Sequence, residues 1–112
     1  MMAAPPAATA QPAKLLRVAL DGPGGESGAA EAARWEHLGD LCEYSGQLDG
    51  ALDAYRRSRD AWATGEHAGR GVALLRLQGR IGETLMFAGR IQEGREAFDR
   101  GLAMMGHRAA PA

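Results

Sequence analysis

Two stretches of the sequence, GQLDGALDAYRRS (46–58) and GRIQEGREAFDRG (89–101), align without a gap at an offset of 43 residues, from position 46 to position 89. The same offset continues toward the N-terminus and pairs identical or similar residues along both segments. It sets Leu48 on Ile91, Ala54 on Ala97, Tyr55 on Phe98, Leu38 on Ile81, Gly39 on Gly82, Cys42 on Leu85 and Tyr44 on Phe87. Self-similarity at a fixed period indicates a repeat architecture. The chain therefore contains two copies of one structural unit.

Apolar residues in each copy recur at the 3.6-residue spacing of a helix, with Tyr44 at the edge of the first stripe. The spacing is interrupted once in each copy, at Gly46 and at Gly89. Short turns between helices produce antiparallel neighbours. We therefore predict an all-α fold of two antiparallel helix-turn-helix hairpins, over about residues 29–65 and 68–106.

Composition excludes several classes of protein. The 112 residues suit one domain, and 46% of them are hydrophobic but only 5% aromatic, a mixture that favours helices. A net charge of -1 disfavours nucleic acid and anionic membranes as partners. The single cysteine cannot form an intramolecular disulfide, and no apolar run reaches the roughly 18 residues of a membrane span. We expect a cytoplasmic protein.

The N-terminal region differs from the repeats. Residues 1–13 (MMAAPPAATAQPA) lack both large apolar side chains and the features of a signal peptide, so we predict a disordered tail. Residues 14–20 (KLLRVAL) can form a short helix that caps the hairpins, followed by a glycine-rich linker up to residue 28. The linker is not a phosphate loop, because no strand precedes it and no Lys-Ser/Thr pair follows it.

The first copy resembles a tetratricopeptide repeat (TPR). The signature residues matched in the first copy are Trp35, Leu38, Gly39, Ala51 and Tyr55, and those in the second are Ile81, Gly82 and Phe98. Gln78 stands at the tryptophan position of the second copy and Gly94 at its alanine position. The resemblance covers about residues 32–106 and implies a short right-handed α-solenoid. The period of 43 exceeds the usual 34, and we place the excess at 60–74, in the second helix of the first copy or the first helix of the second.

The resemblance also implies where a partner binds. In TPR arrays the first helix of each hairpin lines a concave groove, which corresponds here to Glu36, Asp40, Glu43, Arg76 and Glu83. Such a groove, acidic on one side and mixed on the other, favours a basic or helical peptide of a partner protein. The alternative is that the three acidic residues are simply the solvated face of an amphipathic helix.

Catalysis and metal binding have little support. Cys42 lies on the apolar stripe, and His37 is roughly 140° away around the helix, so a buried structural cysteine is favoured over a nucleophile. His37, His67 and His107 are scattered along the chain, and a metal site of His37 with Asp40 or Glu36 is the minor alternative. We predict no enzyme, no catalytic or metal site and no cofactor; a small helical enzyme with a reactive Cys42 is the alternative.

Two repeats are fewer than the roughly three that a stable solenoid needs. The outer faces therefore require the 14–20 helix, a second copy of the chain or a partner protein, and we expect self-association or partial unfolding of the isolated chain. Trp62, Met104 and Met105 either form an uncovered apolar patch or close the core. Two functions fit: a stand-alone protein-binding adaptor, or the sensory or oligomerisation segment of a larger bacterial transcriptional or signalling regulator.

Overall fold

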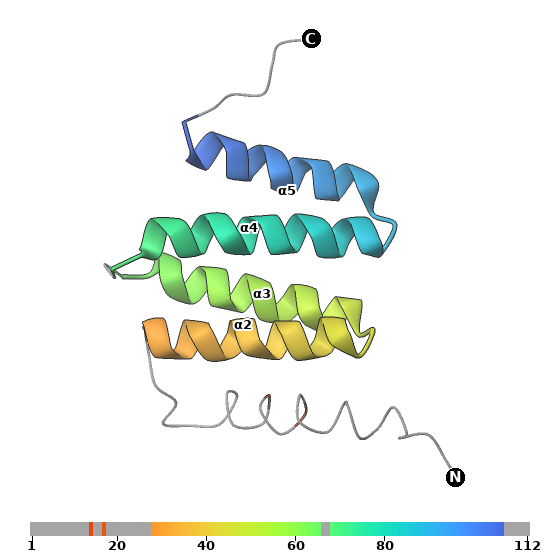
Figure 1. Cartoon of the computed structure of the whole chain (residues 1–112), viewed down its shortest axis with the longest axis horizontal. Helices are drawn as coiled ribbons and strands as arrows, with labels where there is room; N and C mark the ends of the chain where they lie inside the picture. The colour runs from red at the N-terminus through yellow and green to blue at the C-terminus, as the bar shows by residue number, and fades with distance from the viewer. Residues whose placement is uncertain (1–13, 15–16, 18–27, 66–67, 107–112) are drawn as a thin grey trace.

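The computed structural model describes Lys14, Arg17 and residues 28–65 and 68–106. In residues 28–65 and 68–106 it has four helices: α2 (Ala29–Tyr44), α3 (Leu48–Ala63), α4 (Arg70–Phe87) and α5 (Ile91–Met104). The helices pack as sequential antiparallel pairs, α2 with α3, α3 with α4, and α4 with α5 (Figure 1). The predicted all-α fold of antiparallel helical hairpins is thus confirmed. The predicted tail, the glycine-rich linker up to residue 27 and most of the 14–20 segment lie outside the described residues.

The two hairpin turns have the same backbone geometry, which explains the glycine shared by the two copies. Gly46 has a φ of 80° and Gly89 a φ of 79°, in the left-handed region that side chains other than glycine rarely adopt. The N–H of Gln47 donates to the carbonyl five residues earlier at 2.7 Å, and the N–H of Arg90 does the same at 2.9 Å. This is the Schellman arrangement, which ends a helix and satisfies its last carbonyls.

The long repeat period is distributed over three elements. Helices α3 and α4 have 16 and 18 residues, whereas their counterparts α5 and α2 have 14 and 16. Each of the two central helices is therefore longer than its counterpart, and the α3–α4 connection, residues 64–69, takes up the rest. Sequence had assigned the excess to one helix or the other; the structure lengthens both.

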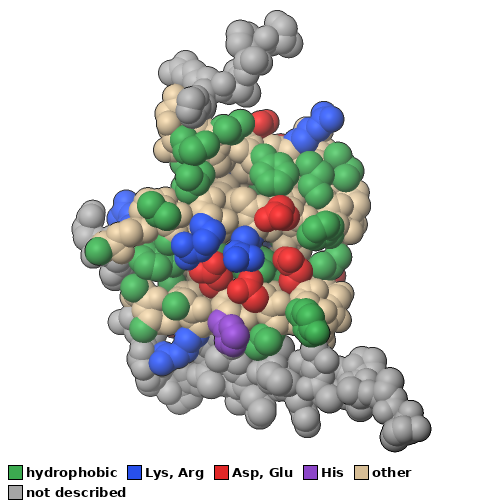
Figure 2. Space-filling model, viewed as in Figure 1, with side chains coloured by type: hydrophobic (Ala, Val, Ile, Leu, Met, Phe, Trp, Pro, Cys, Tyr) green, Lys and Arg blue, Asp and Glu red, His purple; other side chains and the backbone are tan. Residues whose placement is uncertain are grey.

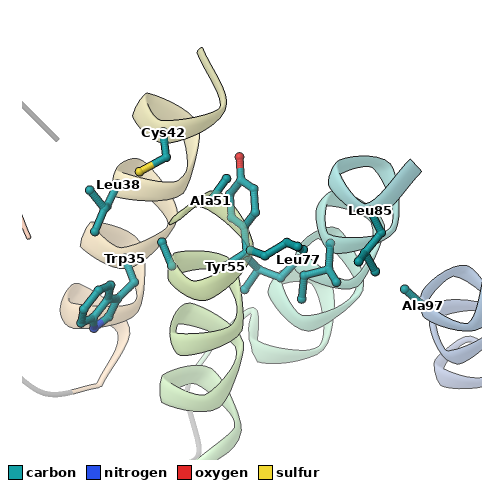
Figure 3. Packing of buried hydrophobic residues seen from close by; sticks show 11 residues of the cluster. Trp35, Leu38, Cys42, Ala51, Tyr55, Leu77, Leu85 and Ala97 are labelled. Carbon is teal, nitrogen blue, oxygen red and sulfur yellow. The ribbon is translucent and has the colours of Figure 1, made fainter. Parts of the chain in front are cut away.

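The hydrophobic core lies mainly among α2, α3 and α4 (Figure 3). Its buried members are Trp35, Leu38, Cys42, Ala51, Leu52, Ala54, Tyr55, Leu77, Ile81, Leu85 and Ala97, with Leu41 and Trp62 packed against them. From α5 only Ala97 belongs to this set of buried, described residues. The last helix therefore contributes least to the core and keeps the largest share of its surface open.

Two glycines inside helices mark close contacts between helices. A β-carbon added at Gly39 would lie 2.5 Å from the Tyr55 ring, and one added at Gly82 would lie 2.6 Å from the Phe98 ring. Atoms cannot approach so closely without a shift, so both positions need glycine despite its cost of about 1 kcal/mol in a helix. The matched pairs lie 43 residues apart. In both copies, a ring on the second helix occupies the space that the glycine leaves on the first.

Candidate functional site

A cluster of charged side chains joins α2 of the first hairpin to α4 of the second. Arg76 donates two hydrogen bonds to the Glu36 carboxylate, from Nε to Oε2 at 2.8 Å and from Nη2 to Oε1 at 2.7 Å. Arg80 lies between two carboxylates, 3.3 Å from Glu36 and 3.2 Å from Asp40. We call Glu36, Asp40, Glu43, Arg76 and Arg80 the cross-hairpin cluster. Figure 2 shows basic and acidic side chains side by side in the middle of one face, with hydrophobic side chains around them.

Two buried hydroxyl groups contact the carboxylates of the cross-hairpin cluster. The Tyr55 hydroxyl donates to Oδ1 of Asp40 at 2.7 Å and lies 3.4 Å from Oε2 of Glu43. The Thr84 hydroxyl lies 3.0 Å from the same Glu43 oxygen and 2.8 Å from the backbone carbonyl of Arg80. Tyr55 and Thr84 are both fully buried. The carboxylates of α2 are therefore held by contacts from two helices, α3 and α4, rather than solvated independently.

The electrostatics of the cluster follow from these contacts. The hydrogen bond from Arg76 holds the pKa of Glu36 below its ordinary value of 4.5, although burial acts in the opposite direction. Burial raises the pKa of Tyr55, and its hydrogen bond to Asp40 raises it further, so the phenol stays protonated. Three carboxylates face two guanidinium groups, which leaves one negative charge. The predicted acidic side of the groove is thus largely neutralised within the molecule.

The Glu36 pKa shift predicts a pH-dependent contribution to stability. Because the folded-state pKa lies below the unfolded value of 4.5, the contribution is fully present above about pH 4.5 and is lost as the pH falls through the folded-state pKa. We expect Glu36→Gln to lower the free energy of unfolding by about 1 kcal/mol at neutral pH and by less in acid, measured by urea unfolding at both pH values. Glu96→Gln, at an exposed position of α5, is the control. An equal cost of Glu36→Gln at both pH values would contradict the assignment.

The structure brings together four of the five predicted groove residues and leaves out Glu83. Glu83 is exposed on α4 and, within the described residues, forms no ion pair or hydrogen bond. Arg80 takes the central place instead, and sequence reasoning missed it. Its signal was its position, one helical turn after Arg76, which puts both guanidinium groups on one side of α4.

Two exposed aromatic side chains lie at equivalent helix ends of the two hairpins. Tyr44 ends α2 and is 84% exposed, and Phe87 ends α4 and is 68% exposed. Each lies one turn beyond a carboxylate of the same helix, Asp40 or Glu83. The expectation that Tyr44 borders the buried stripe is wrong, because Tyr44 follows buried Cys42 by two residues and so faces the opposite side of the helix.

The surroundings of Cys42 favour an unreactive thiol. Its side chain is 5% exposed, and burial raises its pKa, which disfavours the nucleophilic thiolate. His37 is exposed on α2. In residues 28–65 and 68–106, no group of three or more His, Cys, Asp or Glu side chains is placed to hold a metal ion. His67 and His107 lie outside the described residues.

The three residues considered for an apolar patch differ in burial. Trp62 packs against the core, whereas Met104 and Met105 are 47% and 49% exposed at the end of α5. At the other end of the molecule, Arg17 forms an ion pair of 2.8 Å with Asp53 and lies 5.6 Å from the centre of the Trp35 ring. Arg17 therefore contacts the outer surface of the first hairpin, while the end of the second hairpin exposes apolar side chains.

Comparison with protein-family models, curated proteins and solved structures finds no match to this chain. None of the helices in the described part of the chain has both the length and the hydropathy of a transmembrane segment. The functional interpretation accordingly rests on the residues of the chain itself.

Proposed function

We propose that this chain is a protein-binding module of the TPR type, a short right-handed α-solenoid whose α2–α4 face takes a peptide or helical segment of a partner protein. The observation that carries the proposal is the repeated exposed aromatic, Tyr44 on α2 and Phe87 on α4. Single exposed apolar residues are common on protein surfaces. Large aromatics at the same position of two neighbouring repeats are a stronger indication, because aromatic side chains are enriched at protein interfaces and often dominate their energetics.

The charges of this face suggest the chemistry of the partner. The cross-hairpin cluster retains one negative charge, and Glu83 adds another on the same helix as Phe87. A partner segment with apolar side chains for Tyr44 and Phe87 and one or two basic residues would complement the face. A strongly basic segment gains less, because Arg76 and Arg80 already occupy the α2 carboxylates.

Selection of peptides from a displayed random library against the immobilised full-length chain tests this proposal. We expect peptides that combine apolar and basic residues, and we expect the double variant Tyr44→Ala, Phe87→Ala to weaken their binding at least about tenfold, as for interface hot spots. Dissociation constants are measured by fluorescence anisotropy with synthetic peptides.

Val72→Ala is the matched control for the aromatic variants. Val72 is 71% exposed and lies at the opposite end of α4 from Phe87. Its replacement removes a comparably exposed apolar side chain and should leave peptide affinity within about twofold. If no peptide is selected, or if the selected peptides bind the double variant as well as the unchanged chain, the proposed binding face is wrong.

A further inference from the structure

The two hairpins differ in what covers their second helix. In the first hairpin, Leu52 and Tyr55 of α3 are buried in the core together with residues of α4. The positions 43 residues later are Arg95, which is exposed, and Phe98, which borders an open hollow. The hollow is lined by Leu75, Gly79, Phe98, Gly101, Leu102 and Met105. We call these six residues the end face; it is the surface on which a further helical layer would pack.

We infer that the end face binds a second copy of this chain across a two-fold axis. Its centre is apolar, with Leu102 41% and Met105 49% exposed. Arg95 lies one turn before Phe98 on the same side of α5, and Glu83 lies one turn after Gly79 on α4. Neither charge has an ion pair within the described residues. Glu83 and Arg95 both lie near the turn between α4 and α5. A two-fold axis parallel to these helices places α5 of one copy against α4 of the other, so that Arg95 of each copy meets Glu83 of the other.

The opposite end of the molecule favours this symmetry over a continuous stack. Arg17 contacts Asp53 and Trp35 on the outer surface of the first hairpin, where the end face of another copy would otherwise pack head to tail. Among the described residues, the α4–α5 end carries the open apolar hollow. If the end faces of two copies pack against each other, each face covers the other. The assembly then closes as a dimer.

The size of the face indicates a weak dimer. Helices of 14 and 18 residues, at 1.5 Å per residue and roughly 10 Å apart, offer on the order of 500 Å² from each copy. The total of about 1,000 Å² is at the lower limit for a specific interface. We expect a reversible dimer with a dissociation constant on the order of 10 μM.

Sedimentation of the full-length chain from about 1 to about 500 μM tests the inference, with that constant as the expected midpoint. We expect Leu102→Glu combined with Met105→Glu to raise the dissociation constant at least about tenfold. Met104→Glu is the matched control, because Met104 is 47% exposed on the same helix but does not line the hollow. Circular dichroism confirms that each variant is folded at the temperature of the measurement.

Charge reversal separates a specific interface from apolar adhesion. Arg95→Glu and Glu83→Arg should each weaken the dimer about fivefold or more, and the double variant should restore most of the affinity, because the pair is then re-formed with opposite sign. The inference is overturned if the chain stays monomeric over the whole concentration range. It is also overturned if a dimer forms but the end-face variants leave it unchanged, or if the two charge reversals act independently.

Discussion

Replacing Leu77 with alanine is expected to lower the free energy of unfolding by about 2–5 kcal/mol. Leu77 is fully buried on α4, in the part of the core where the second hairpin meets the first (Figure 3). Truncation removes buried methyl groups and leaves a cavity that tightly packed neighbours fill only partly. A domain of this size loses roughly 4–8 °C of melting temperature per kcal/mol, so a drop of at least about 8 °C should follow.

Leu102→Ala is the control for the same chemical change at an open position. Leu102 is 41% exposed on α5, so its truncation should cost less than about 1 kcal/mol. Urea unfolding followed by circular dichroism measures both variants, at a protein concentration near 1 μM so that the expected dimer does not contribute. Comparable losses for Leu77→Ala and Leu102→Ala would show that the two hairpins do not share the core described here.

The helical hairpins could be predicted because their signals are local. A left-handed glycine after each first helix, at Gly46 and Gly89, is required by the Schellman turn wherever the hairpin packs. The apolar spacing defines which side of each helix is buried. Gly39 and Gly82 give a further local signal. Glycine lowers helix propensity, so a glycine in the middle of a helix indicates a close contact with a neighbouring helix.

The binding face could be predicted only in part, because it depends on how the hairpins are rotated relative to each other. The sequence placed Glu36, Asp40 and Arg76 along the groove, but it did not show that Arg80 reaches Glu36 and Asp40. That contact depends on the angle between α2 and α4, which the periodicity of either helix leaves open. The acidic residues therefore looked free to bind a partner, whereas in the structure they join the hairpins.

The exposure of Tyr44 and Phe87 illustrates a different limit. The alignment pairs these residues, but the helical spacing of the apolar residues placed Tyr44 at the edge of the buried stripe. Their position two residues after a buried side chain, Cys42 or Leu85, turns them away from the core. An apolar residue off the buried stripe that recurs at the repeat period is a signal for a binding surface, and it was present in the sequence.

Replacing Gly39 with alanine is expected to lower the free energy of unfolding by about 1–2 kcal/mol. The added methyl group would lie 2.5 Å from the Tyr55 ring. That ring is fully buried, and its hydroxyl donates to Asp40 at 2.7 Å, so it has no room to withdraw. Overpacking typically costs about 1–3 kcal/mol, and the gain of about 1 kcal/mol in helix propensity offsets only part of it.

Gly82→Ala is the matched substitution in the second hairpin, and it should change stability by less than about 1 kcal/mol. The added methyl group meets the Phe98 ring at 2.6 Å, a similar distance, but Phe98 has no hydroxyl and borders the open end face. Its ring can therefore turn outward and let the helix keep most of the gain in propensity. Urea unfolding at low protein concentration measures both variants. Equal losses of stability at the two glycines would mean that Phe98 is held as firmly as Tyr55, which α4 covers. That result would contradict the description of the end face as open.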